Sequence, residues 1–514
     1  MTPMPAALDI LFGQAYFLRF DPKLWDAQQP YAPLGALYAA AAVREHGYQV
    51  AMFDAMLATS EAEWVAALDR HRPRVAVIYE DSFNYLSKMC LLRMRQAALT
   101  MAEAAAARGV PVVVAGSDAS DHPDIYLNHG VDVVVAGEGE VTLVEVLDVL
   151  FERRVASAGP LSNVAGVCFR GADGRLVRTP TREIIRDLDG LARPAWDLID
   201  VERYREIWQR RHGYFSMNIV TTRGCPYHCN WCAKPIYGQR YGARSPEHVA
   251  AEIAWLHETY RPDHLWIADD IFGLKPGWIE RFAERVAALG AVTPFKCLLR
   301  ADGVTDDVAR LLAAAGCRTA WIGAESGAQE VLDAMEKGTR VDQIYHAARA
   351  LRATGIEVGF FLQFGYPGET LAHVERTLQM VRDCEPDDIG VSVSYPLPGT
   401  PFYERVKEQL GAKQNWVDSN DLAMMYHATY VPAFYRALHA LVHAEFRARK
   451  TPSLAHGVKA CLHAVAASAY HAARIPFLRL RLRRLAREDT AAAPTRFAPG
   501  LSRHAAAMPS EQPQ

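Results

Sequence analysis

The chain has 514 residues, of which 50% are hydrophobic and 22% are charged, with a formal net charge of −3. This length allows two or three domains with buried cores, and the composition is that of an ordinary globular protein. The nearly balanced charge argues against nucleic acid as an obligatory partner.

The first residues lack a basic segment followed by a long apolar core, so we expect no signal peptide. No uninterrupted apolar stretch reaches the length of about 18 residues that a membrane helix needs. We therefore expect a cytoplasmic protein.

Residues 1–150 alternate apolar runs with alanine-rich stretches, and this rhythm predicts a doubly wound parallel α/β sheet. The expected strands are 8–12, 48–53, 75–79, 110–115 and 131–136, and the expected helices are 34–45, 61–70 and 89–107. Ligands of such sheets bind beyond the carboxyl ends of the strands. The loops expected there are 81–84, 116–120 and 137–140.

Residues 151–210 are expected to form a connector. Gly171 to Gly174 reads as a turn between two short strand-like runs, 164–170 and 176–179. A segment punctuated by proline and glycine, 188–197, follows before the next regular pattern.

Three cysteines then occur within eight residues, Cys225, Cys229 and Cys232, with the spacing C-x3-C-x2-C. A [4Fe–4S] cluster normally takes four cysteine ligands, so three from one loop would leave one iron open. A zinc site with His228 as fourth ligand is an alternative. The other cysteines are scattered singly, as in a reducing compartment: Cys90, Cys168, Cys297, Cys317, Cys384 and Cys461.

The cysteine loop follows a strand-like run, 216–223, and opens a second β/α series. Further strands are expected at 264–268, 295–299, 319–322, 358–364 and 389–394. Helices are expected at 246–259, 276–288, 306–315, 329–335, 341–353 and 370–383. Six such units predict a partial TIM-like (β/α)6 barrel, with chemistry at the carboxyl ends of the strands.

Polar residues and one glycine follow four of these strands: Asp269, Asp270, Arg300, Asp302, Glu325, Ser326 and Gly365. An arginine there could hold a carboxylate through two hydrogen bonds. The last strand carries Ser392 and Ser394, directly before a loop, 395–401, that we expect on the substrate side. Simpler interpretations stay open, because the aspartate pair could cap a helix or bind a cation. The segment 365–370 could be an ordinary turn.

Beyond residue 410 we expect a helical extension, 411–488, with helices at 416–426 and 434–450. Within it, 475–487 interleaves leucine with arginine. That pattern fits a helix on an anionic membrane surface, but a helix packed by its leucines against the domain is favoured. The alanine- and proline-rich tail, 489–514, is expected to be disordered.

The motif CxxxCxxC with an aromatic residue before the last cysteine, here Trp231, resembles the radical S-adenosylmethionine (SAM) superfamily. The resemblance implies that the open iron chelates SAM and that reduction yields a 5′-deoxyadenosyl radical. It also implies an external one-electron donor of flavodoxin or ferredoxin type. The SAM contacts that it implies are Trp231, Asp269, Asp270, Arg300, Glu325, Ser326 and Gly365.

The first half is similar to the cobalamin-binding domain that precedes many radical SAM domains, in the segments 31–35, 115–117 and 137–140. The implied cobalamin contacts are Ser82, Gly116, Ser117, Gly137, Glu138 and Gly139. The Asp-x-His-x-x-Gly motif, whose histidine ligates cobalt in many such domains, is missing. Either cobalt has no imidazole ligand from the protein, or the domain binds substrate or nothing.

The whole chain thus resembles cobalamin-dependent radical SAM enzymes, both methylases and the anaerobic Mg-protoporphyrin ester cyclase. The implied reaction is methylation of an unactivated carbon in a small metabolite. A radical cyclisation or rearrangement of a tetrapyrrole-like or other natural product is an alternative, as is a non-catalytic redox or sensory protein. The expected divisions are 1–150, 151–210, 211–410, 411–488 and 489–514.

Overall fold

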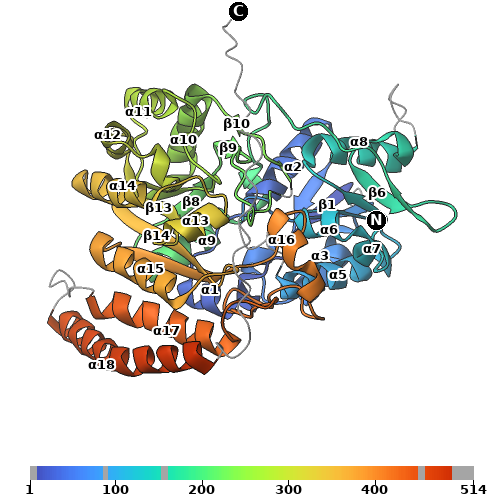
Figure 1. The fold of residues 1–514 in the computed structure, drawn as a ribbon. Coiled ribbons are helices and arrows are strands. Elements are labelled where there is room, and N and C mark those ends of the chain that lie inside the picture. The colour runs from blue at the N-terminus through green and yellow to red at the C-terminus, as the bar shows by residue number, and fades with distance from the viewer. Residues whose placement is uncertain (1–7, 85–90, 152–159, 235, 450–457, 489–514) are drawn as a thin grey trace, which may run out of the picture.

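The structure is a computed structural model, and it describes residues 8–84, 91–151, 160–234, 236–449 and 458–488. The side chains of 458–463 lie outside this description. Two α/β domains lie side by side, and two long C-terminal helices pack against the second of them (Figure 1). The predicted disordered tail, Cys90 and the first residues of the helix expected from residue 89 lie outside the described residues.

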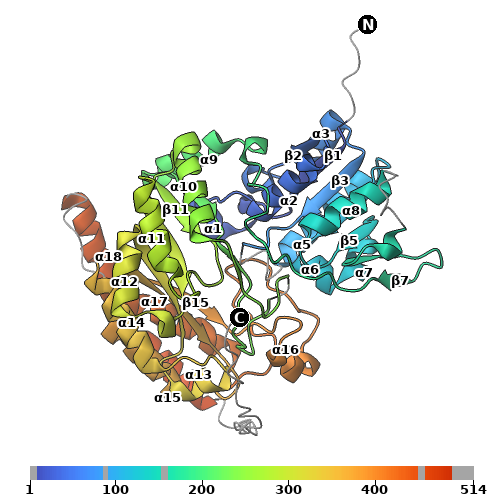
Figure 2. The same cartoon turned by 90° about the horizontal axis from the view of Figure 1, so that it is seen from above.

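The first domain contains a seven-stranded sheet with the order β2-β1-β3-β4-β5-β6-β7. Strands β1 to β5 are parallel, as predicted. One face packs on Trp64 and Met101, and the other packs on Ala40 and Leu147, so helices cover both faces and the sheet is doubly wound (Figure 2). The strands are β1 (Ile10–Gly13), β2 (Val50–Met52), β3 (Val75–Tyr79), β4 (Val112–Ala115) and β5 (Val133–Val135). The helices are α1 (Pro22–Ala27), α2 (Leu34–Glu45), α3 (Ala62–His71), α5 (Leu92–Ala106), α6 (Ser117–Asp121), α7 (Pro123–Leu127) and α8 (Glu140–Leu150).

The predicted hairpin in the connector is present as β6 (Val167–Arg170) and β7 (Leu176–Arg178). It extends the sheet of the first domain, because β6 pairs antiparallel with β5, with Val135 opposite Val167. Helix α9 (Val201–His212) then leads into the second domain.

The second domain has six parallel strands in the order β15-β14-β13-β12-β11-β8, with helices along their outer face (Figure 2). This arrangement confirms the partial barrel. Side-chain caps start several helices where expected; for example, Ser245 accepts from the backbone N–H of His248. The strands are β8 (Ser216–Ile219), β11 (His264–Ile267), β12 (Phe295–Leu299), β13 (Cys317–Glu325), β14 (Glu357–Phe364) and β15 (Asp388–Val393), with a short antiparallel pair β9 (Thr222–Arg223) and β10 (Gly242–Ala243). The helices are α10 (Pro246–Tyr260), α11 (Trp278–Ala288), α12 (Asp306–Ala314), α13 (Gln329–Ala334), α14 (Val341–Ala353), α15 (Leu371–Cys384) and α16 (Pro401–Val406).

A segment of the first domain, residues 21–33, lies along the open side of this partial barrel. The hydroxyl of Tyr31 is 3.1 Å from the Ser216 hydroxyl of β8, and Asn218 donates to the Ala32 carbonyl at 2.9 Å. Near the other edge strand, Lys23 lines the same cavity as Gly390 of β15. The two domains are therefore joined over a long stretch of chain.

The C-terminal extension contains α17 (Pro432–Arg449) and α18 (Val458–Glu488), but the helix predicted over 416–426 is wrong. The short acidic side chains in that stretch bind nearby backbone N–H groups instead. Asp421 accepts from Val417 and Ala423, and Asp418 accepts from Asn420. Such local bonds compete with a helix.

Within α18, Leu478 and Leu482 are buried against the domain, which confirms packing through leucines. Phe477 and Leu480 remain exposed on the same helix. Of the helices in the described ranges, none combines the length and the apolar character needed to cross a membrane.

Candidate active site

The cysteine loop begins at the end of β9, where Gly224 has a φ of +76°. A Cβ atom at this position would lie 2.3 Å from the Arg240 carbonyl, so the turn requires glycine. Asn230 then anchors the loop, because its backbone N–H donates to the Met335 carbonyl at 3.0 Å and its side chain accepts from Tyr366 at 2.9 Å. The loop is thus held by the elements that follow β13 and β14.

The donor set of the loop fits an iron–sulfur cluster. Cys225 and Cys229 are buried and Cys232 is half-buried, and all three are free thiols. Burial raises the pKa of Cys232 to about 12, although the charge of Lys234 lowers it. The thiol is therefore protonated at neutral pH, and a metal that binds it displaces the proton. Within the described part of the chain, no three Cys, His, Asp or Glu side chains converge as ligands of a single ion.

Arg300 lies against this loop rather than pointing freely into a substrate pocket. Its guanidinium stacks on the Tyr227 ring at 3.5 Å and approaches the Cys229 sulfur to 3.8 Å. The same group binds Asp302 through two hydrogen bonds of 3.0 and 2.8 Å. The structure therefore uses Arg300 and Asp302 to position the cysteine loop.

Trp231 belongs to the cysteine loop, and Glu325 lies near it. Glu325 has a φ of +57°, unusual for a non-glycine residue, at an irregularity of β13. Its carboxylate pairs with buried Lys337 at 2.9 Å, and Lys337 lies 6.0 Å from the Trp231 ring. The Trp231 indole N–H has no hydrogen-bond partner within the described part of the chain, so it is free to bind a ligand.

The aspartate pair after β11 is split between two roles. Asp269 is buried and accepts hydrogen bonds from the backbone N–H groups of Thr221 and Thr222, at 2.7 and 3.0 Å. Burial raises the pKa of Asp269 to about 6, although these hydrogen bonds lower it. Asp270 is exposed and acts electrostatically on Cys225 and Cys232. Asp270 is thus the member of the pair that faces the cysteine loop.

The remaining predicted SAM contacts are engaged within the protein. The Ser326 hydroxyl lies 3.2 Å from that of Thr377. The Gly365 N–H donates to Glu369 at 2.6 Å, and its carbonyl accepts from Tyr426 at 2.5 Å. The two serines expected before a substrate-side loop are a separate pair: Ser394 accepts from Gln363 at 2.9 Å, and Ser392 is half-buried on β15.

The carboxyl edge of the first sheet carries the predicted cobalamin contacts and one residue that we did not predict. Glu80 follows β3 and packs against Gly116, with one carboxylate oxygen bonded to the Ala15 N–H at 3.0 Å. Its other oxygen is buried without a hydrogen-bond partner among the described residues. Such an orphaned group at this edge fits a polar ligand, and cobalamin carries many amides. Ser117 is buried beside it.

Glu138, predicted to contact cobalamin, binds the second domain instead. Together with Glu140 it forms ion pairs of 2.9 and 2.6 Å with Arg223, which lies two residues before Cys225. All three side chains are at most 5% exposed. Glycines flank Glu138 in this turn, at Gly137 and Gly139. We call Arg223, Glu138 and Glu140 the interdomain latch.

Aromatic rings surround the latch. The Arg223 guanidinium lies 5.5 to 5.6 Å from the rings of Tyr38, Phe83 and Tyr237. Predicted contact Ser82 is 2.6 Å from the Tyr237 hydroxyl. The sequence gives one indication of this cluster, because the charged residue Arg223 directly precedes the Gly224–Cys225 turn. Its partners are seen only in the folded structure.

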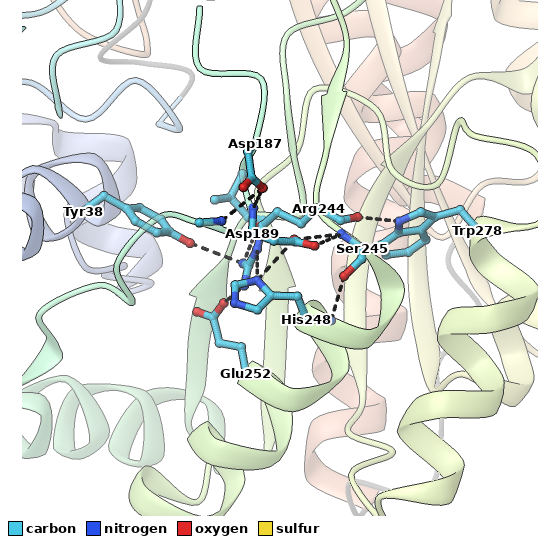
Figure 3. A network of polar contacts seen from close by, with 10 residues as sticks. Tyr38, Asp187, Asp189, Arg244, Ser245, His248, Glu252 and Trp278 are labelled. Carbon is cyan, nitrogen blue, oxygen red and sulfur yellow. Dashed lines mark hydrogen bonds and ion pairs between the residues drawn. The ribbon is translucent and has the colours of Figure 1, made fainter. Parts of the chain in front are cut away.

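A second polar junction joins the connector to both domains (Figure 3). Arg244 donates to the Tyr38 hydroxyl of α2 at 3.3 Å and forms a buried ion pair with Glu252 of α10. The Ser245 N–H donates to Asp189 of the connector at 2.9 Å. The edge of the first sheet is therefore fixed relative to the cysteine loop at two places.

The environment of Glu80 gives a testable pH dependence. Burial raises its pKa from 4.5 to about 8, so the folded protein holds it protonated over a range where the unfolded chain ionises it. The wild type should therefore lose stability as pH rises through this window. Glu80→Gln stays neutral, and we expect it to gain about 1–3 kcal/mol over wild type across the window in urea unfolding. A pH-independent difference would contradict the burial of a neutral carboxyl.

Comparison with protein families supports both halves of this arrangement. The B12 binding domain family matches residues 26–147, and the radical SAM superfamily matches residues 219–381. The chain carries a B12 binding domain followed by a radical SAM domain. The radical SAM domain implies a [4Fe–4S] cluster and SAM, and the B12 binding domain implies cobalamin; these are the predicted cofactors.

Among curated proteins, the chain is 27% identical to an uncharacterised methyltransferase of Pyrococcus horikoshii, over 59% of this chain and 65% of the relative. It is 28% identical to the anaerobic magnesium-protoporphyrin IX monomethyl ester cyclase of Synechocystis, over 44% of each. It is 25% identical to the hopanoid C-3 methylase of Methylococcus capsulatus, over 79% of this chain and 75% of that one. The chain spans only 44% to 65% of the length of the first two.

Solved structures share the fold. The methyltransferase TsrM from Kitasatospora setae, with cobalamin and a [4Fe–4S] cluster bound, superposes with a TM-score of 0.62 at 21% identity, over 78% of each chain. The cobalamin-dependent SAM radical enzyme OxsB, with aqua-cobalamin bound, gives 0.70 at 17% identity, over 93% of this chain and 72% of its own. Both confirm the predicted order of a parallel-sheet domain followed by a partial barrel.

Proposed function

We propose that this protein is a cobalamin-dependent radical SAM methyltransferase acting on an unactivated carbon of a small molecule. The observation that carries the proposal is the interdomain latch. Arg223 ties the turn after β5, at the cobalamin edge, directly to the start of the cysteine loop. Two cofactor sites that are locked together in this way suit a reaction in which both act on one substrate.

The protein's own residues have the following proposed roles. Cys225, Cys229 and Cys232 hold the cluster, which when bound supplies the site for reductive SAM cleavage. Arg300 and Asn230 position the loop. The indole N–H of Trp231 and the exposed carboxylate of Asp270 are the proposed SAM contacts, and the Glu325–Lys337 pair shapes the same edge of the barrel.

Cobalamin, when bound, would carry the methyl group, and the edge of the first sheet would hold it. Glu80 and the glycine turns after β4 and β5 are the proposed contacts, together with Ser117. The absence of the Asp-x-His-x-x-Gly motif leaves the lower face of cobalt without an expected imidazole ligand. Glu138 helps to hold this edge against the cysteine loop, through the interdomain latch.

The wider assignment is also part of this proposal. A flavodoxin or ferredoxin would supply the electron, and the free cysteines of the described residues fit a reducing, cytoplasmic compartment. We retain the division of the chain into 1–150, 151–210, 211–410 and 411–488, with one change. The β6–β7 hairpin is placed in the first domain, because β6 is hydrogen-bonded to β5.

The anaerobically reconstituted protein, incubated with reductant, SAM, cobalamin and a metabolite pool, tests the reaction type. A methylase of this kind should form 5′-deoxyadenosine and S-adenosylhomocysteine in equal amounts. Deoxyadenosine without S-adenosylhomocysteine would support the second candidate, a radical cyclase, which the Synechocystis relative favours. If neither product formed, a sensory or redox protein would be the better explanation.

A further inference from the structure

The inner face of the barrel is hollow along much of its length. On β12 and β13 the inward positions Lys296, Leu298 and Trp321 are half-buried, whereas the outward positions Cys297 and Ala320 are fully buried. The next strand, β14, presents Phe361, which is 39% exposed although it lies within the sheet. Solvent therefore reaches the inside of the barrel, and a cavity of about 690 Å³ opens at its amino-terminal end.

Aromatic rings line this hollow. Trp321 stacks on Phe361 with ring centres 4.7 Å apart, and it lies over Gly359, where a Cβ atom would approach it to 2.4 Å. On the opposite side Trp266 packs against Tyr31 at 4.6 Å. Flat faces of this kind suit an apolar or aromatic ligand body. Trp321 also lines the cavity of about 690 Å³, together with Lys296 and several charged side chains.

An ammonium group stands beside two of these rings. Lys296 lies 4.9 Å from the Tyr31 ring and 5.2 Å from the Trp266 ring. Among the described residues, it forms no ion pair with a carboxylate. Burial lowers its pKa to about 8, so it is still mainly protonated at neutral pH.

Two charged groups at the mouth of the cavity have partners of their own. Arg382 binds Glu445 at 3.0 Å, and Glu357 accepts from Thr319 at 3.1 Å. Lys296 is half-buried, and a partly desolvated cation is stabilised when an anion joins it. Lys296 is thus a cation of this cavity with which an anionic ligand would pair.

We infer that the barrel interior binds an amphiphilic small molecule whose apolar or aromatic body lies between Trp321, Phe361 and Trp266 and whose anionic group pairs with Lys296. That this molecule is the substrate rests on the proposed function. Lys296 is four residues before Arg300, which directly follows β12, so the two are roughly 13 Å apart along the extended chain. The substrate's reacting carbon would then lie about that far from its anionic group.

Two matched probes test the site without turnover: anilinonaphthalene sulfonate, and phenylnaphthylamine, which lacks only the sulfonate. Equilibrium dialysis of the reconstituted holoprotein measures each affinity. Lys296→Met should weaken sulfonate binding about tenfold or more, because a charge-assisted contact is lost, and should leave the neutral probe within about twofold. Lys296→Arg should restore the sulfonate affinity, and Lys275→Met, at an exposed position outside the barrel, should change neither.

Phe361→Ala should weaken both probes equally, since it removes only apolar contact. Sulfonate affinity that is unchanged in Lys296→Met would overturn the inference, as would equal loss of both probes in that variant. Because the assay needs neither reductant nor SAM cleavage, it separates the two proposals. Charge-selective binding in a protein that never forms deoxyadenosine would refute the proposed function and leave this site standing.

Discussion

Replacing Cys229 with alanine is expected to reduce the iron and sulfide bound after anaerobic reconstitution to near background. Deoxyadenosine formation should fall to the level seen without protein. The physical reason is that one loop supplies all three predicted ligands, and two thiolates cannot hold a cluster that already lacks a fourth. Metal analysis and the visible absorption of the reconstituted protein measure the loss.

The matched control is Cys384→Ala. Cys384 is a buried thiol at the end of α15, away from the cysteine loop. This substitution should cost only about 1 kcal/mol of stability and retain the cluster. If Cys229→Ala kept a full complement of iron and sulfide, or if the wild type bound zinc instead, the assignment of the loop would be wrong.

The second large effect is expected at the interdomain latch. Arg223→Met should lower the free energy of unfolding by about 3–5 kcal/mol, because it leaves the buried carboxylates of Glu138 and Glu140 unpaired. Urea unfolding followed by tryptophan fluorescence measures this cost. Deoxyadenosine formation should fall as well, since Arg223 is adjacent to the cysteine loop.

A charge-balanced variant separates pairing from packing. Arg223→Met combined with Glu138→Gln and Glu140→Gln should recover much of the lost stability, because no unpaired charge is then buried. The control Arg281→Met breaks an exposed pair with Glu247 and should cost less than about 1 kcal/mol. Similar costs for Arg223→Met and Arg281→Met would show that the latch does not join the domains.

The elements were predictable where apolar periodicity was strong. The helix 34–45 and the strands 75–79 and 295–299 have the predicted boundaries, since each is a continuous run bounded by turn residues. The structure of residues 416–426 was not predictable in this way. Its aspartates accept hydrogen bonds from nearby backbone N–H groups, and apolar content alone does not reveal such local bonds.

The site divides in a similar way. The cysteines were readable from spacing because all three ligands come from one loop. Glu138 was assigned to cobalamin from its place in a glycine turn, but its partner Arg223 is 85 residues away and meets it only through the packing of two domains. Glu80 gave no signal because its importance lies in a missing partner, which only a folded structure reveals. Lys296 gave none because its place beside the Tyr31 and Trp266 rings depends on how the chain folds.

The most direct test of the central claim is SAM cleavage by the reconstituted protein. Under anaerobic conditions, with a one-electron reductant and SAM, the account predicts 5′-deoxyadenosine above the level of the Cys229→Ala variant, detected by liquid chromatography and mass spectrometry. Wild-type protein that carries a reduced [4Fe–4S] cluster and yet forms no more deoxyadenosine than that variant would contradict it.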